Sequence, residues 1–277
     1  MNVNPLIAPT LLLAYALAFA SYAVTRRIKG VSLQAAWFVA AVLGALPAVS
    51  MPLYYTHLYD HWAAYYAFRA LPYSELTASG AGLLAGVVAH WARRFHARGR
   101  FVDMALLVLL TLGVAAPYAK PVLAPVAPGV FQDRWSEGVC LQSTASCGAA
   151  CTATFLKLFG FDMTERQIAQ ECFTYVAGTE NWYLARALRK RGLNVTFVVL
   201  DPKARELPIP CIAGIKMGEA GHFICILGEE NGAIVVGDPL MGRYTCTKDE
   251  LFAKIRFAGF FMHIETQSAS RRMTATQ

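Results

Sequence analysis

The first part of the chain contains uncharged stretches about as long as a lipid bilayer is thick. Residues 5–24 and residues 31–52 carry no charged side chain. A helix needs about 20 apolar residues to cross the hydrocarbon core. Two further apolar stretches follow, at residues 76–92 and 102–119. We therefore expect four transmembrane α-helices in a membrane domain that covers residues 1–120.

Basic residues flank these stretches unevenly. Residues 26–29 hold three Lys/Arg and residues 93–100 hold four, whereas residues 53–75 hold one, Arg69. Loops rich in Lys and Arg stay in the cytoplasm, so four spans leave both termini outside it. The first basic cluster follows the first apolar stretch, whereas in a signal peptide the basic region precedes the apolar one. We therefore interpret the first stretch as a retained span. We expect a multi-pass protein of the bacterial inner (cytoplasmic) membrane, with everything after about Tyr118 on the periplasmic side.

The loop between the second and third apolar stretches is rich in Tyr, His and Trp. This composition at residues 54–73 is typical of an aromatic belt at the membrane surface. His57, Asp60 and His61 fall at helical spacing and leave two interpretations, a metal-binding face or an interfacial helix with polar tips. We favour the second interpretation and expect no metal and no other cofactor.

Gly82 and Gly86 form a small-residue pattern in the third apolar stretch. Such a pattern lets two helices approach closely. It serves either packing within one bundle or dimerisation, and the sequence does not choose. The expected partners are accordingly the lipid bilayer and either a second copy of the chain or another membrane protein.

The character of the chain changes after residue 120. Residues 121–134 are a Pro-rich linker, residues 135–265 have the composition of a globular domain, and residues 266–277 are expected to be a flexible tail. Helical patterns come first in this domain, at residues 147–159, 164–172 and 181–191. The second begins with Thr164 and has Gln167 three residues later, which predicts a capping box. Short β-rich runs come later, at residues 195–200, 212–216, 223–227, 233–236 and 260–264, with a short helix at residues 249–257. This order predicts an α+β domain.

Four residues of this domain form a pattern typical of nucleophilic catalysis. Cys147 opens a predicted helix, whose N-terminus lowers the pKa of a thiol. His222 begins an apolar strand and is suited to accept the thiol proton and return it to a leaving amine. Asp238 follows the next strand and is suited to orient the imidazole. Gln142, five residues before Cys147, offers an amide for an oxyanion hole.

The sequence around these residues resembles the papain-like cysteine peptidases, above all the bacteriocin-processing branch, also called double-glycine leader peptidases. The similar segments are LQSTASCGAAC at residues 141–151, GHFICIL at residues 221–227 and GDPLMG at residues 237–242. The resemblance covers roughly residues 135–265. It implies a papain-like helical lobe plus an antiparallel sheet, and peptide hydrolysis through a thioester intermediate.

The globular domain also holds six cysteines besides Cys147. An oxidising outer compartment permits disulfides among them, and six cysteines are enough for three bridges. Their spacing does not determine which of them pair. They are Cys140, Cys151, Cys172, Cys211, Cys225 and Cys246.

The leading hypothesis is a membrane-anchored cysteine endopeptidase that hydrolyses a peptide bond in an extracytoplasmic peptide or protein. It requires no nucleic acid. One alternative keeps the site but changes the reaction to that of an amidase or transpeptidase. Another is a catalytically idle peptide-binding domain that serves a membrane partner. A transporter or channel is disfavoured, because Asp103 is the single acidic residue within the four apolar stretches.

Overall fold

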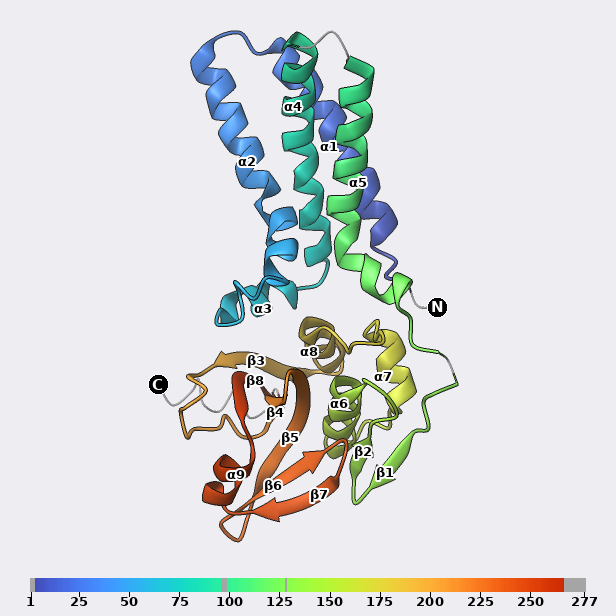
Figure 1. Cartoon of the computed structure of the whole chain (residues 1–277), viewed down its shortest axis with the longest axis vertical. Coiled ribbons are helices and arrows are strands. Elements are labelled where there is room, and N and C mark those ends of the chain that lie inside the picture. The colour runs from blue at the N-terminus through green and yellow to red at the C-terminus, as the bar shows by residue number, and fades with distance from the viewer. Residues whose placement is uncertain (1–2, 96–98, 128, 267–277) are drawn as a thin grey trace. The chain divides into compact units, whose positions relative to one another are not determined.

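The computed structural model describes residues 3–95, 99–127 and 129–266 (Figure 1). These residues form two compact units. The helical unit comprises Val3–Tyr59 and Pro72–Leu123, and the mixed unit comprises Asp60–Leu71 and the chain from Ala124 onwards. Residues 60–71, which we expected within the membrane domain, thus group with the mixed unit.

The helical unit is built from long helices around a central one. Its helices are α1 (Ile7–Arg27), α2 (Val31–Tyr54), the 3-10 helix η1 (Ser74–Gly80), α4 (Ala81–Phe95) and α5 (Gly99–Leu123). Helix α4 packs against α1, α2 and α5. An ion pair between Arg93 of α4 and Asp103 of α5 links two of these helices.

Two helices of the described chain, α1 and α2, are long and apolar enough to cross a membrane. The prediction of four such helices is therefore wrong for the third and fourth apolar stretches, which form α4 and α5. Helix α4 has only 15 residues, because the residues before it form η1 instead of an α-helix. Its length of about 22 Å is short of a hydrocarbon core of about 30 Å. In α5 the apolar stretch found among the described residues is Phe101–Ala116.

The two glycines of the third apolar stretch bring α4 against α1. A Cβ atom on Gly82 would lie 2.0 Å from the carbonyl oxygen of Ala14, and one on Gly86 would lie 2.3 Å from that of Ala18. Ser21 adds a hydrogen bond from its hydroxyl to the Leu83 carbonyl at 2.7 Å. The glycine pattern therefore serves packing within the bundle.

Gly82→Ala is expected to lower the thermal stability of the helical unit, because the new methyl group forces α1 and α4 apart. Overpacking of this kind costs about 1–3 kcal/mol. The measurement is thermal unfolding of the detergent-solubilised protein. Gly113→Ala is the matched control, since a Cβ atom on Gly113 would have no described atom within 4 Å apart from the adjacent backbone of its own helix. Equal melting temperatures for both variants would contradict the close packing.

The aromatic loop does not form the expected interfacial helix. His57 lies in a turn with a positive φ of 63°, so His57, Asp60 and His61 do not share one helix face. The described residues contain no cluster of metal-binding side chains. Helix α3 (Ala63–Arg69) instead buries Tyr66 in the mixed unit, where its ring lies 4.9 Å from that of Phe260.

Helix α8 (Asn181–Arg189) fastens α3 to the mixed unit. The guanidinium of Arg186 donates to the carbonyl oxygen of Arg69 at 2.6 Å, and that of Arg189 donates to the carbonyl of Ala70 at 3.3 Å. The last carbonyls of a helix have no partner within it, so these bonds satisfy the end of α3. The Arg69 guanidinium in turn lies over the Trp182 ring, 5.2 Å from its centroid.

The mixed unit contains a six-stranded sheet in the order β3-β8-β4-β5-β6-β7. All neighbouring strands are antiparallel. The strands are β3 (Leu193–Val199), β4 (Cys211–Met217), β5 (Ala220–Glu230), β6 (Ala233–Asp238), β7 (Gly242–Cys246) and β8 (Phe257–Thr266). A separate hairpin joins β1 (Arg134–Ser136) to β2 (Val139–Leu141).

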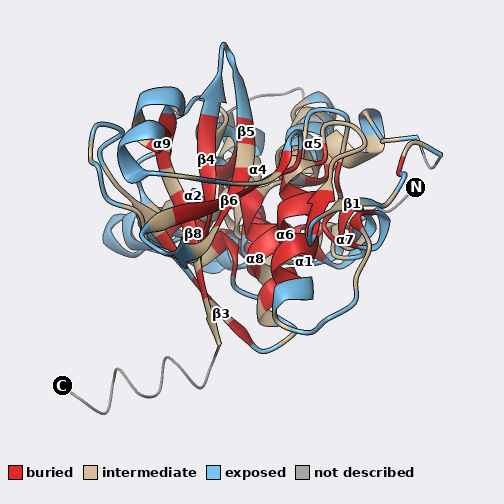
Figure 2. Cartoon of the chain, turned by 90° about the horizontal axis from the view of Figure 1, so that it is seen from below, coloured by how far each residue is buried: buried red, intermediate tan, exposed pale blue. Residues whose placement is uncertain are grey.

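Three helices precede the sheet, and one lies within its chain order. They are α6 (Cys147–Leu158), α7 (Glu165–Glu171), α8 and α9 (Lys248–Lys254). The capping box predicted at Thr164 and Gln167 is present at the start of α7. Figure 2 shows α6 and the central strands largely buried, and residues 148–156 of α6 are all buried. A helical lobe beside an antiparallel sheet is the α+β arrangement that the sequence predicted.

Candidate active site

Cys147 is the first residue of α6, and its side chain is half-buried. The helix packs against β5, the strand that carries His222. The close packing of α6 against β5 and α8 needs a small residue after Cys147. A Cβ on Gly148 would lie 2.7 Å from Leu184 of α8 and 3.4 Å from Phe223 of β5. The thiol therefore stands at a helix N-terminus, where backbone N–H groups favour a negative charge.

His222 and Asp238 meet across the neighbouring strands β5 and β6. Cys225 pairs with Gly237, so Asp238 falls beside Ile224, two residues from His222 and on the same face of the sheet. His222 Nε2 lies 3.0 Å from Asp238 Oδ1, and both side chains are less than a tenth exposed. The same carboxylate oxygen accepts the Leu240 backbone N–H at 2.8 Å.

Two opposing effects act on the His222 imidazole. Burial alone lowers its pKa, because the charged form loses water. Hydrogen bonds with Asp238 and with Cys147 outweigh burial and raise the pKa of His222 to about 9. Since Nε2 faces Asp238, Nδ1 is the ring nitrogen left for the thiol. The structure thus brings the three expected catalytic residues together.

Gln142 lies beside the turn that carries Asp238. Its backbone N–H donates to the carbonyl oxygen of Pro239 at 2.9 Å. Its side-chain Oε1 is buried and accepts no hydrogen bond from the described residues. The backbone contact ties the segment before the nucleophile to the segment after β6, so Gln142 and Asp238 are positioned by the same turn.

The sequence analysis missed Glu165, a fully buried carboxylate behind the nucleophile segment. It accepts the backbone N–H of Ser143 at 2.8 Å and hydrogen bonds from the hydroxyls of Ser143 and Ser146. The three bonds fix the four residues that precede Cys147. The only sequence signal was the capping box around Glu165, which predicts an acidic residue in a first turn but not its burial.

Glu165→Gln is expected to slow alkylation of Cys147 and to lower the stability of the protein by about 1–3 kcal/mol, because a carboxylate accepting several hydrogen bonds is lost. Alkylation of the full chain is followed by peptide mass mapping, with half-buried Cys246 as the internal reference thiol. Glu229→Gln, at an exposed position, is the matched control. Unchanged Cys147 labelling and stability in Glu165→Gln would contradict a positioning role.

All seven cysteines are free thiols in the structure, so none of the permitted disulfides is present. Burial raises the pKa of the Cys140 thiol to about 12, and it also raises the pKa values of Cys151, Cys172 and Cys211 well above the ordinary range of a thiol. A buried thiol with a raised pKa is a poor nucleophile. These four cysteines are therefore part of the core and not of the chemistry.

A thiol at a helix N-terminus, an imidazole within hydrogen-bonding reach and a carboxylate on the far ring nitrogen define the class of cysteine hydrolases. Comparison with known proteins narrows this class. The sequence profile of the peptidase C39 family matches residues 137–269. An uncharacterized protein of Methanothermobacter thermautotrophicus is 31% identical over 130 residues, which are 47% of this chain and 89% of that protein.

Two other similar proteins have descriptive names. The probable functional amyloid protease FapD of Pseudomonas aeruginosa is 25% identical over 159 residues, covering 52% of this chain and 67% of FapD. A crystal structure of a double glycine motif protease from an AMS/PCAT transporter, in complex with the leader peptide, is 23% identical with a TM-score of 0.40. The match covers 50% of the present chain and 97% of the protease chain in that crystal structure. The chain belongs to the peptidase C39 family and is a cysteine peptidase.

Proposed function

We propose that this protein is a membrane-anchored endopeptidase that hydrolyses a peptide bond of an extracytoplasmic peptide or protein. Cys147 is the nucleophile, His222 the general acid and base, and Asp238 the residue that orients the imidazole. The observation that carries the proposal is the buried hydrogen bond between His222 and Asp238, with the Cys147 thiol on the other side of the ring.

The reaction follows from these positions. The active form is an ion pair in which the Cys147 proton is on His222 Nδ1, and the thiolate of this pair attacks the carbonyl carbon of the scissile bond. The oxyanion that forms accepts hydrogen bonds from the Cys147 backbone N–H and from the side-chain amide of Gln142. The imidazolium then protonates the leaving amine, and a thioester remains. His222 then takes a proton from water as the hydroxide attacks the thioester, the thiolate leaves the carbonyl carbon, and release of the acid product restores the thiolate–imidazolium pair.

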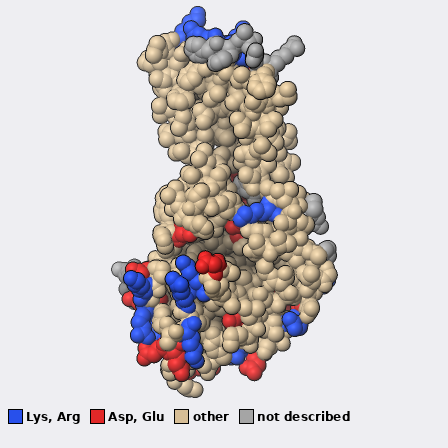
Figure 3. Space-filling model, in the orientation of Figure 1, with Lys and Arg blue, Asp and Glu red and all other residues tan. Residues whose placement is uncertain are grey.

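The surface of the helical unit supports membrane anchoring. Large apolar side chains are strongly exposed along three helices, as in Phe19 of α1 (77%), Leu43 of α2 (59%) and Leu109 of α5 (65%). Exposure of this kind suits a lipid environment. Figure 3 shows the visible face of this unit, below its basic upper end, almost without charged side chains.

The ends of the bundle support an orientation. Basic residues lie in the last turns of α1 and α4, Arg26 and Arg27 in one and Arg93 and Arg94 in the other. Both helices end at the same end of the bundle, whereas α2 and α5 end at the opposite one (Figure 1). With the basic end in the cytoplasm, the chain that follows α2 and α5 is on the periplasmic side.

Cys147→Ala is expected to abolish hydrolysis, by at least about a thousandfold, because removal of a nucleophile leaves only binding and electrostatic effects. The substrate probe is a set of quenched fluorescent peptides with a central Gly-Gly, and the measurement is turnover by the full chain in detergent. Product masses that sum to substrate plus one water identify hydrolysis, and Cys246→Ala is the control. Turnover that survives in Cys147→Ala would refute the proposal.

Asp238→Asn is expected to move the alkaline limb of the kcat/KM profile to lower pH. The active form needs protonated His222, so kcat/KM of the wild type falls as pH rises through about 9. Loss of the carboxylate removes the main contact that raises the pKa of His222. The alkaline limb therefore moves to lower pH, by about one pH unit or more. A limb that stays in place would contradict the pairing.

A further inference from the structure

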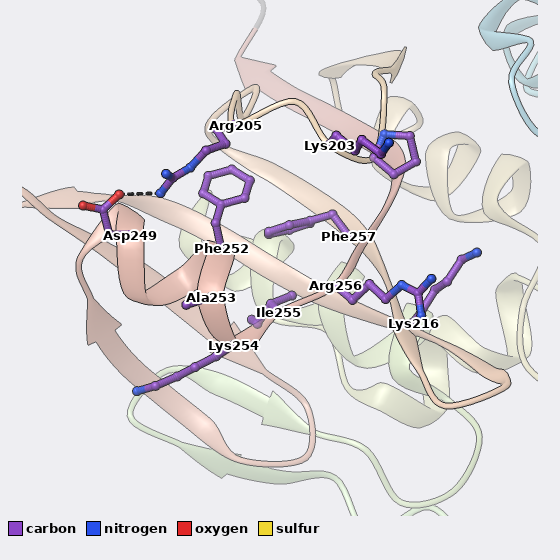
Figure 4. Close-up of a pocket in the computed structure, with 11 residues that line it drawn as sticks. Lys203, Arg205, Lys216, Asp249, Phe252, Ala253, Lys254, Ile255, Arg256 and Phe257 are labelled. Atoms are coloured by element: carbon purple, nitrogen blue, oxygen red, sulfur yellow. Dashed lines mark hydrogen bonds and ion pairs between the residues drawn. The ribbon is translucent and has the colours of Figure 1, made fainter.

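The mixed unit contains a basic cavity beside α9 that the catalytic mechanism does not use. Its volume is about 910 Å³ (Figure 4), at the upper end of the range for ligand pockets. It is lined by residues from the segment before β4, from β4 itself, from α9 and from the start of β8. Five of the lining residues are cationic: Lys203, Arg205, Lys216, Lys254 and Arg256.

The charge of the cavity is unbalanced. Asp249 is the single acidic residue among the described lining residues, and it pairs with Arg205. The other four cations have exposed side chains, so they are accessible to a ligand. A cavity lined mostly by one sign of charge concentrates ligands of the opposite sign. The expected ligand is therefore an anion.

The floor of the cavity is apolar. Phe252 and Phe257 lie with ring centroids 5.3 Å apart, and the Arg205 guanidinium lies 5.4 Å from the centroid of the Phe252 ring. In Figure 4 the Lys and Arg side chains are spread around the cavity and do not converge on one point. Separate cations above an apolar floor suit a peptide with several carboxylates better than a single compact phosphate group.

The strand register connects the cavity with the catalytic histidine. Lys216 of β4 lies opposite Gly221 of β5, and Ile215 lies opposite His222. The Lys216 backbone N–H also donates to the carbonyl oxygen of Arg256 at 2.8 Å, which joins two cationic positions of the lining. Lys216 is thus the chain neighbour of the residue that pairs with His222, although successive side chains of a strand point to opposite faces of the sheet.

We propose that this cavity binds an acidic segment of the peptide substrate. The inference rests on the proposed peptidase function and adds a substrate class to it. Carboxylates of the segment pair with the Lys and Arg side chains, and its apolar side chains pack against the half-buried Phe252. Binding of this kind selects the substrate and raises its association rate, and it weakens as salt is added.

The test uses the full chain with Cys147→Ala, in nonionic detergent, and two fluorescein-labelled hexapeptides, one of Glu and one of Gln. Fluorescence anisotropy measures their binding. The Glu peptide is expected to bind at least about tenfold more tightly, and Lys203→Glu with Lys254→Glu is expected to remove this preference. Arg134→Glu with Lys190→Glu changes the net charge equally at positions outside the cavity lining and should retain it.

The possible outcomes distinguish failure of the cavity proposal from failure of the proposed peptidase function. Equal loss in both double variants, or no preference for Glu, overturns the acidic-segment proposal. A second arm uses wild-type chain and Gly-Gly peptides flanked by Glu or by Gln. Turnover of both at the same kcat/KM overturns the cavity proposal and leaves the peptidase intact. Binding of the Glu hexapeptide without any peptide turnover overturns the proposed peptidase function and leaves an anion-binding cavity.

Discussion

The hydrogen bond between His222 and Asp238 is the interaction on which the active site depends. An isolated imidazole in a buried position favours its neutral form, and an isolated buried carboxylate is costly. Each group lowers the free-energy cost of burying the other. The carboxylate stabilises the protonated ring, and the ring donates a hydrogen bond to the carboxylate. The antiparallel register of β5 and β6 sets this contact. Gly237 preserves it, since a Cβ there would lie 2.9 Å from Val139.

A second buried carboxylate organises the other half of the site. Glu165 of α7 holds the segment before Cys147, and the turn after Asp238 holds Gln142. The helical lobe and the sheet therefore each contribute one acidic residue, and the thiol lies where their two networks meet. Such fixed groups cost little reorganisation when the reaction begins. This arrangement explains why the site needs both lobes of the mixed unit.

The sequence predicted what is encoded locally. The helix that starts at Cys147, the capping box at Thr164 and the strands around His222 and Asp238 follow from periodicity and from residues close in the chain. The triad was predicted from the types of these residues and from the elements that carry them, and the resemblance to a family supported it. The role of Glu165 could not be predicted from the sequence, because its burial depends on residues about twenty positions away. It also misjudged α4 and α3, because hydropathy does not distinguish an α-helix from a 3-10 helix or a membrane surface from a protein surface.

The chain enters the mixed unit twice, first as residues 60–71 and again from Ala124 onwards. A fragment that starts in the Pro-rich segment would therefore lack α3. The rings of Phe197 and Phe260, which Tyr66 contacts in the intact protein, would lose part of their cover, and Arg186 and Arg189 would lose the carbonyls that they bind. Exposed aromatic surface promotes aggregation. A soluble version of this peptidase would thus require that α3 be supplied, for example by fusion through a linker, and could not be obtained by simple truncation.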